Sequence, residues 1–298
     1  MTTHLVGVDW GTSSLRAARL DAAGEVIEER SLARGILTVP AGDFPAVFEQ
    51  ACGDWMREPG ALALVCGMAG SRQGWVEAPY AACPAGFAEV AAQLTWIEPG
   101  HIALVPGLAC EEHGVPDVMR GEETQVFGAL DLLGLRSALL VLPGTHSKWV
   151  RVIDGDIERF ATFMTGECYA LLRRHSILAR MMPPEDGELD AGAFVQGVQQ
   201  ARRGGSLLHA AFSARTLALF ERLSAAALPS YLSGLVIGEE LRAQDLRGTL
   251  SVAVIGAQAL TRRYELGLST LGITVTRVGS QAAWRGLHAI ASTLQGTP

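Results

Sequence analysis

Asp9 stands at the end of an apolar run and leads into a turn rich in glycine and hydroxyl groups. The segment reads VGVDWGTSSLR, and its turn holds Gly11, Thr12 and Ser13. Glycine lets backbone amides come close to a phosphate, and the hydroxyl groups add further donors. A carboxylate at the end of a strand can hold Mg²⁺ through water, because Mg²⁺ keeps several of its waters. The segment predicts a phosphate and metal site, and the alternative is an ordinary hairpin turn.

A second turn of the same kind follows 133 residues later, in PGTHSK at positions 143–148. When the chain is shifted by this offset, the Gly-Thr pair of the first turn aligns with Gly144 and Thr145. Leu142 stands in the place of the first carboxylate. The match predicts two phosphate-binding turns, of which the first alone offers a carboxylate to a metal.

Three further side chains of the second turn could contact a ligand: His146, Ser147 and Lys148. Lys148 is the one lysine among the 24 basic residues of a chain that otherwise uses arginine. Either lysine is required at this position, or a single lysine has escaped the bias towards arginine. His146 is equally consistent with a contact to phosphate or a sugar acid and with a plain turn residue.

The segment GMAGSRQGWVEAPY follows an apolar run at 61–67, so its polar groups lie at the end of a buried strand. Open α/β sheets bind ligands at the carboxyl ends of their strands. Arg72 suits a planar carboxylate, because its guanidinium can bind two oxygens at once, and Ser71 and Gln73 add donors. Trp75 predicts a wall against the carbon chain of a substrate, with core packing as the alternative. Arg16 is either a second anion contact or an exposed strand residue.

The bulk properties limit the classes of protein that these groups can serve. With 298 residues, of which 49% are apolar, the chain is long enough for two domains that each bury a core. A net charge of −7 argues against a nucleic-acid binder, and no apolar run approaches the ~18 residues of a membrane span. The five cysteines are scattered without a CxxC pair, so disulfides and structural zinc are not expected. With no basic leader before the first apolar run, we expect a cytoplasmic protein without nucleic-acid or membrane partners.

Strands and helices alternate along the chain. Alternating apolar residues and Gly or Asp turns predict strands at 4–8, 15–20 and 25–30, and again at 138–142, 148–153 and 157–160. Between these groups we expect helices at 44–56 and 121–134 and strands at 61–67 and 101–107. Later segments predict helices at about 167–180, 190–201, 207–227, 233–246, 257–266 and 281–294, and strands at 251–256 and 273–279. This alternation indicates an α/β fold.

Six blocks in a fixed order carry a resemblance to a known family: DWGTSSLR, GMAGSRQGW, RGEETQVFG, LPGTHSKW, FMTGECYALL and SGLVIGEEL. The first and fourth resemble the phosphate-binding hairpins of the actin/hexokinase/heat-shock-protein superfamily, and SVAVIGAQAL resembles its adenosine-binding strand, with Gly256 at the turn. The ordered set resembles the 2-dehydro-3-deoxygalactonokinase family over nearly the whole chain. The resemblance implies phosphorylation of 2-keto-3-deoxygalactonate at its 6-hydroxyl, in galactonate catabolism, with ATP and Mg²⁺.

The resemblance also implies two actin-like, ribonuclease H-like domains with an ATP and substrate cleft between them. We expect an N-terminal, substrate-side domain over residues 1–136 and a C-terminal, nucleotide-side domain over residues 137–280. The closing helix at about 281–298 is expected to pack back on the first domain. The sequence leaves the oligomeric state open, with a homodimer as one option.

The same resemblance points to a catalytic base. Related sugar kinases take the hydroxyl proton with an Asp at the start of the helix before the second hairpin, and RGEETQVFG puts Glu122 at that position. Glu122 departs from the common Asp by one methylene, and Asp9 is its rival as the base. A carboxylate at a helix start also stabilises the helix dipole by ~0.3–1 kcal/mol, so a structural role is the alternative. Glu123 is interpreted as a solvated or structural neighbour.

Other functions stay open on the sequence alone. A kinase of the same superfamily could act on another sugar or sugar acid. A non-catalytic ATP-dependent switch uses the same fold, although no helix-turn-helix segment precedes the first hairpin, as a repressor would require. A ribokinase-type enzyme needs a late D-T-x-G-x-G-D segment and a P-loop enzyme needs G-x-x-x-x-G-K-[ST], and the sequence has neither.

Overall fold

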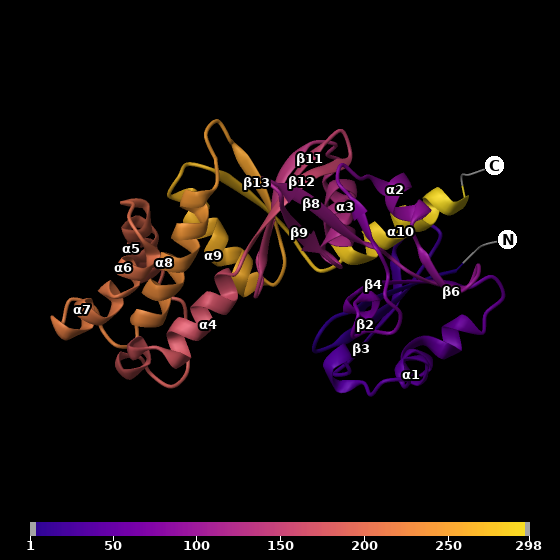
Figure 1. Cartoon of the computed structure of the whole chain (residues 1–298), viewed down its shortest axis with the longest axis horizontal. Coiled ribbons are helices and arrows are strands. Elements are labelled where there is room, and N and C mark those ends of the chain that lie inside the picture. The colour runs from indigo at the N-terminus through magenta and orange to yellow at the C-terminus, as the bar shows by residue number, and fades with distance from the viewer. Residues whose placement is uncertain (1–3, 296–298) are drawn as a thin grey trace. The chain divides into compact units, whose positions relative to one another are not determined.

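The computed structural model of the chain describes residues 4–295 (Figure 1). These residues group into two compact units. Unit 1 contains the described residues up to Leu140, the segment Val150–Ala161 and the described residues from Val278 onwards, and unit 2 contains Val141–Trp149 and Thr162–Arg277. The domain boundary expected between residues 136 and 137 stays a prediction.

Unit 1 is built on a six-stranded sheet with the strand order β3-β2-β1-β4-β7-β6. Its strands are β1 (Leu5–Trp10), β2 (Leu15–Leu20), β3 (Val26–Leu32), β4 (Leu62–Gly67), β6 (Thr95–Glu98) and β7 (Ile102–Leu104). β1, β2 and β3 pair as antiparallel neighbours, whereas β4 lies parallel to β1. Asp9 therefore stands in register with Arg16 on one side and with Cys66 on the other.

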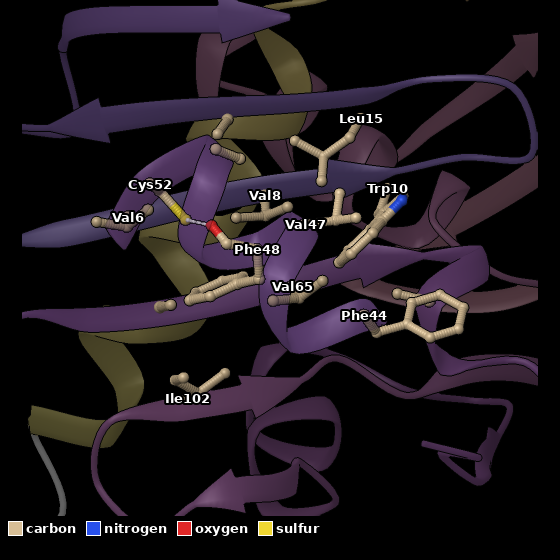
Figure 2. Packing of buried hydrophobic residues seen from close by; sticks show 14 of the residues in the cluster. Val6, Val8, Trp10, Leu15, Phe44, Val47, Phe48, Cys52, Val65 and Ile102 are labelled. Atoms are coloured by element: carbon tan, nitrogen blue, oxygen red, sulfur yellow. Dashed lines mark hydrogen bonds between the residues drawn. The ribbon is translucent and has the colours of Figure 1, made fainter. Parts of the chain in front are cut away.

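Helix α1 (Phe44–Met56) covers one face of this sheet. Side chains alternate along a strand, so Val6, Val8 and Trp10 of β1 point to the same face. They pack there with Phe44 and Phe48 of α1, in the core shown in Figure 2. Burying each large side chain stabilises the folded state by about 1.5–3 kcal/mol, and this burial holds α1 on the sheet.

Helix α10 (Ala282–Gln295) lies on the opposite face of the same sheet. Gly7 points to that face, and a Cβ added to it would lie 3.1 Å from side-chain atoms of both Trp284 and Leu287. α10 also packs along α3 (Glu122–Leu133) and against α2 (Phe87–Ala92). Because Asp9 is two residues beyond Gly7, its side chain is on the α10 face.

A separate three-stranded sheet follows, with the order β5-β8-β9. Its strands are β5 (Tyr80–Ala82), β8 (Gly107–Glu112) and β9 (Val115–Met119). β9 leads through Arg120 and Gly121 into α3. The sequence analysis did not predict this sheet, and the strand expected at 101–107 extends only over Ile102–Leu104.

A five-stranded sheet has the order β12-β11-β10-β13-β14. Its strands are β10 (Ala138–Leu142), β11 (Ser147–Ile153), β12 (Asp156–Phe163), β13 (Ser251–Ile255) and β14 (Thr274–Val278). Like the first sheet, it places three consecutive strands in reverse order and then adds the next strand beside the first of the three. This shared order agrees with the repeated hairpin in the sequence, and the expected α/β fold class is confirmed.

The helices of unit 2 are α4 (Thr165–His175), α5 (Ala191–Arg202), α6 (Leu207–Ala211), α7 (Ser213–Leu219), α8 (Leu228–Ala243) and α9 (Gln258–Ser269). The helix expected at 207–227 is wrong in its extent, because α6 and α7 are short and the following residues form turns until α8 begins. The helix expected at about 167–180 ends at His175 and is followed by a short 3₁₀ segment, Ile177–Met181.

None of the helices described between residues 4 and 295 is long and apolar enough to span a membrane.

Candidate active site

Asp9 lies in β1, one residue before the strand ends, and is partly buried, with 20% of its side chain exposed. Nη2 of Arg16, from the neighbouring strand, donates to Oδ2 of Asp9 at 2.7 Å. The Arg16 guanidinium also lies over the ring of Trp284 in α10, with Cζ 5.2 Å from the ring centroid. Arg16 therefore compensates the charge of Asp9 and fixes one of its oxygens, while Oδ1 faces Gly67.

The first turn is exposed, and backbone hydrogen bonds hold it in place. The Gly11 amide donates to the Ser14 carbonyl at 2.9 Å, which closes the turn between β1 and β2. The Ile36 and Leu37 amides donate to the carbonyls of Gly11 and Thr12. Thr12 and Ser13, which carry the hydroxyl groups of the turn, stay exposed. The turn is thus held in place through its carbonyls, and its polar side chains face solvent.

The start of α3 lies beside Asp9. Gly121 has a φ of +102°, and a Cβ placed on it would lie 3.0 Å from Cα of Gly67. A Cβ on Gly67, which has a φ of +88°, would in turn lie 3.5 Å from Oδ1 of Asp9. Only glycine tolerates both the backbone angles and the close approach here. These contacts bring the ends of β1 and β4 and the helix start that bears Glu122 into one place.

The two glutamates at this helix start have different surroundings. Glu122 is partly buried, and its Oε2 accepts a hydrogen bond from the Arg120 amide at 3.0 Å. Glu123 is fully buried, and both of its carboxylate oxygens accept from the Gly121 amide, at 2.9 and 2.7 Å. Burial, reinforced by the charge of Glu122, raises the pKa of Glu123 to about 8. The interpretation of Glu123 as solvated is wrong, and its structural alternative agrees with these contacts.

The segment after β4 distributes its predicted ligand residues unevenly. Arg72 is 87% exposed and pairs with Glu77, with Nε 2.9 Å from Oε1. Gln73 is exposed as well, whereas Oγ of Ser71 is buried. Trp75 packs on the core, with its ring centroid 5.2 Å from that of Phe48. The structure therefore separates these four side chains into two exposed, one buried and one packed against the core.

The second turn, in unit 2, connects β10 to β11. Thr145 and His146 are exposed and Gly144 is partly buried, and Nε2 of His146 lies 2.6 Å from Oε2 of Glu167. Lys148 is buried, and its Nζ donates to Oγ1 of Thr162 at 2.7 Å. Lys148 is thus a buried residue near the start of β11 and not a solvated one.

The N-terminus of α4 packs against this turn. A Cβ on Gly166 would lie 2.9 Å from Cα of Thr145, and the Glu167 amide donates to the Thr145 carbonyl at 3.0 Å. Gly256, at the end of β13, is also close, because a Cβ there would lie 3.8 Å from the Pro143 carbonyl. A helix N-terminus with exposed amides favours anions such as phosphate.

A pocket of about 150 Å³ opens beside this turn within unit 2. Its walls come from the turn and from helices α4, α8 and α9: Pro143, Gly144, Thr165, Gly166, Tyr169, Ser233, Val236, Ile237, Leu260, Arg263 and Tyr264. The pocket is mostly apolar with a few polar groups, which is the usual make-up of a small-molecule site. Apart from Gly144, the sequence analysis named none of these residues as ligand contacts.

Glu240 was also missed, although it organises the surroundings of the second turn. It is buried in α8, and its carboxylate accepts hydrogen bonds from Ser147 Oγ, Trp149 Nε1, Thr165 Oγ1 and Tyr264 Oη. Burial raises the pKa of Glu240, and the four hydrogen bonds act in the opposite direction. The signal available in the sequence was a pair of glutamates following the apolar run of this helix, which does not reveal that Glu240 is the buried one.

No group of three or more His, Cys, Asp or Glu side chains in the described part of the chain is arranged to hold a metal ion. Asp9 could contribute one carboxylate oxygen, since its other oxygen is held by Arg16. This fits an ion that arrives with most of its ligands already supplied by water and phosphate, as Mg²⁺ does.

Comparison with known proteins identifies relatives over nearly the full length. The family model described as 2-keto-3-deoxy-galactonokinase matches residues 9–290. A protein of Rhizobium meliloti (strain 1021), described as a 2-dehydro-3-deoxygalactonokinase, is 39% identical over 98% of both chains. The 2-dehydro-3-deoxygalactonokinase of Escherichia coli (strain K12) is 33% identical, again over 98% of both chains.

A crystal structure has the same fold. It is of a protein from Sinorhizobium meliloti described as a 2-dehydro-3-deoxygalactonokinase, and it is 37% identical to this chain. The TM-score is 0.89, with 98% of this chain and 100% of the other covered. The similarity thus extends over both units and over 98% or more of each relative.

Proposed function

This chain belongs to the 2-keto-3-deoxygalactonokinase family, and from that membership we propose that it transfers the γ-phosphate of ATP to the 6-hydroxyl of 2-keto-3-deoxygalactonate. The compound is the 2-dehydro-3-deoxygalactonate of the relatives' names. The observation that carries the proposal is the family match over residues 9–290, a range that contains both phosphate-type turns and the helix start at Glu122.

Unit 2 supplies the proposed nucleotide site. The apolar pocket beside the second turn would take the adenosine, with Gly256 close by, and Gly144 and Thr145 would take the phosphates. Ser147 stays a prediction as a phosphate contact, since it is buried and its Oγ donates to Glu240. His146 and Lys148 are the remaining cationic or ionisable candidates of this turn. Backbone amides at a helix N-terminus and a glycine turn are suited to phosphate, so the pocket and the turn together fit a nucleoside triphosphate.

Unit 1 supplies the residues that we propose bind Mg²⁺ and the sugar acid, and a second turn for the phosphates. Asp9 would hold Mg²⁺ through water, and that ion would neutralise charge on the transferring phosphate. Gly11, Thr12 and Ser13 would offer the first turn to the phosphates. Arg16, Ser71, Arg72, Gln73 and Trp75 stay predictions as contacts to the sugar acid.

In the proposed reaction the 6-hydroxyl oxygen attacks the γ-phosphorus, its proton passes to the Glu122 carboxylate, and the bond to the β-phosphate oxygen breaks to leave ADP. Phosphoryl transfer depends mainly on positioning and charge, and help from a general base adds typically 10²–10⁴-fold. Because Glu122 sits at a helix start fixed by Gly121 and Gly67, its carboxylate is positioned by backbone rather than by a flexible loop.

The test is ADP release with Mg·ATP and a panel of acceptors: 2-keto-3-deoxygalactonate, 2-keto-3-deoxygluconate, galactonate, galactose and glycerol. We expect turnover concentrated on the first compound, with the new phosphate on O6 by phosphorus NMR. Turnover on another member would keep a kinase and replace the substrate. ATP binding without turnover on any member would favour the non-catalytic switch.

We further propose a cytoplasmic location, which fits an enzyme that uses ATP and a catabolic sugar acid. A homodimer stays a prediction, and the mass of the purified protein in solution would test it.

A further inference from the structure

Arg120 is a buried arginine whose hydrogen-bonding capacity is only partly used. The residue is 9% exposed, and it connects β9 to the start of α3. Its Nη2 donates to the Ala78 carbonyl at 2.8 Å, and its Cζ lies 4.3 Å from the ring centroid of Tyr80. Its Nε and Nη1 are buried and have no hydrogen-bond partner among residues 4–295. Native proteins rarely leave buried donors unpaired, because each one loses its hydrogen bonds to water.

A second unpaired group lies next to it along the loop. Oγ of Ser71 is buried and likewise lacks a partner within the described chain. A Cβ placed on the preceding residue, Gly70, would lie 2.8 Å from Nη1 of Arg120. The guanidinium therefore lies directly against the backbone next to Ser71, so two residues with unused buried donors are close together in unit 1.

The nearby carboxylates do not satisfy these donors. Glu123 receives the Gly121 amide on both oxygens, and Glu122 receives the amide of Arg120, whereas Nε and Nη1 of Arg120 form no hydrogen bond within residues 4–295. Charge-assisted pairing of a guanidinium with a carboxylate is the strong form of such a contact. The arrangement calls for a planar acceptor with two oxygens that the chain itself does not supply.

We propose that Arg120 and Ser71 bind the carboxylate of the sugar acid, an inference that rests on the proposed function. Oε2 of Glu122 accepts a hydrogen bond from the amide of Arg120, so the carboxylate and the guanidinium are at most one arginine side chain and one hydrogen bond apart. In 2-keto-3-deoxygalactonate a carbon chain of similar length separates the 6-hydroxyl from the carboxylate. One helix start can therefore hold both ends of the substrate.

Arg72 is the competing arginine, and the structure gives it a weaker case. It is exposed and already paired with Glu77, so a carboxylate bound there would stay in contact with water and be screened. Arg120 instead lies under the segment 71–79, which has neither helix nor strand. The carboxylate must displace part of this irregular segment to reach Nε and Nη1, and pairing the buried donors favours that displacement.

The experiment compares two substrates of nearly the same shape, 2-keto-3-deoxygalactonate and its carboxamide, which lacks the charge and has one acceptor oxygen fewer. We expect Arg120→Gln to lower kcat/KM for the acid by about 10- to 100-fold relative to the amide, in keeping with a lost charge-assisted contact. The KM for ATP should not change, and Arg120→Lys should recover part of the preference for the acid. The ratio of the two substrates within one preparation does not depend on the fraction of folded enzyme.

Arg57→Gln, on an exposed arginine of the same unit, serves as the matched control and should keep the wild-type ratio. An unchanged ratio in Arg120→Gln, or a larger loss of the ratio in Arg72→Gln, would overturn the proposal and leave the kinase intact. A wild-type protein that does not phosphorylate the acid at all would overturn the proposed function and this assignment together.

Discussion

Glu122 and Glu123 are adjacent residues of one type, and the fold gives them different chemistry. Glu122 keeps partial exposure at the start of α3, where a substrate hydroxyl could approach. Glu123 is enclosed and holds the Gly121 amide. A base must exchange protons with a substrate, whereas a buried carboxyl with a raised pKa is suited to fixing the backbone that precedes it.

For Glu122→Gln we expect kcat to fall by about 10²–10⁴-fold with little change in KM for ATP, because the amide keeps the shape and cannot take the proton. The measurement is steady-state ADP release with the best acceptor of the panel. Asp9→Asn should also lower kcat severely. Raising the Mg²⁺ concentration should partly restore the kcat of Asp9→Asn and leave that of Glu122→Gln unchanged. Wild-type turnover in Glu122→Gln would assign the base to another group.

For Glu123→Gln we expect a change in the pH dependence of folding. The pKa of Glu123 is raised from 4.5 to about 8, so between these values the unfolded chain loses the proton and the folded chain retains it. The free energy of unfolding of the wild-type protein should therefore fall as pH rises from 5 to 8. In Glu123→Gln the contribution of this carboxyl to the fall, on the order of a few kcal/mol, should be absent.

Urea unfolding of both proteins at pH 5 and at pH 8 measures this difference. Glu111→Gln, on an exposed glutamate of the same unit, is the control for removing one carboxylate. Equal slopes of stability against pH in wild type and Glu123→Gln would mean that Glu123 is ionised in the folded protein.

At the residue scale, the sequence predicted groups whose chemistry is local. The two glycine turns are recognisable because turn, glycine and hydroxyl groups lie within a few neighbouring positions. Arg120 and Glu240 were missed because their partners are remote: Arg120 reaches Ala78, and Glu240 meets Ser147 from another part of the chain. Arg72 looked favourable as a type of residue, and only the fold reveals that it is exposed and paired.

At the element scale, periodicity worked where one helix or strand carries its own pattern. The helix expected at 44–56 agrees with α1, because its apolar face repeats with helical spacing and Pro45 suits a helix start. β5, β8 and β9 were missed because each is short and is held by pairing with the others, which no local pattern reports. No proline or glycine lies between α6 and α7 to mark the interruption, and both helices pack on α8, a contact that no local pattern reports.

Glu240 acts at this scale, since it connects three elements of unit 2 through α8. Its carboxylate holds Ser147 at the start of β11, Thr165 at the start of α4 and Tyr264 in α9. For Glu240→Gln we expect a loss of about 1–3 kcal/mol in the free energy of unfolding, because an amide nitrogen replaces an acceptor facing donors. We also expect KM for ATP to rise roughly 10-fold while KM for the sugar acid stays close to wild type, equivalent to about 1.4 kcal/mol in nucleotide binding.

Glu239→Gln is the matched control on the neighbouring residue, which pairs with Arg242 at the surface. Nucleotide binding is best measured by calorimetry with ADP, which separates binding from turnover. Unchanged ADP affinity in a destabilised Glu240→Gln would limit Glu240 to a structural role.

At the scale of the whole molecule, the two units do not follow each other along the sequence, because each is assembled from separate segments of the chain. Unit 1 contains both the first strands and α10, so residues near the two ends of the chain complete one structure. The cation–π contact of Arg16 with Trp284 and the packing of Gly7 under Leu287 make α10 part of the Asp9 surroundings. The predicted closing helix could be found from its amphipathic pattern, but its partners could be inferred only from the family resemblance.

Gly286 tests how closely α10 must approach α3. A Cβ at Gly286 would overlap the Thr124 carbonyl, and one at Gly128 would overlap the Ala282 carbonyl, so the two helices meet backbone to backbone. Alanine is favoured over glycine by about 1 kcal/mol in a helix interior, yet backbone atoms cannot turn aside as a side chain can, and overpacking costs typically 1–3 kcal/mol. We therefore expect Gly286→Ala to lower the unfolding midpoint and also kcat, because α3 carries Glu122 at its start. Gly192→Ala in α5, where the nearest atom would lie 3.4 Å from the added Cβ, should leave both values at wild type or slightly raise the midpoint. A stabilised Gly286→Ala with full activity would mean that helix propensity outweighs the contact and that α10 can move away without disturbing Glu122, the proposed base.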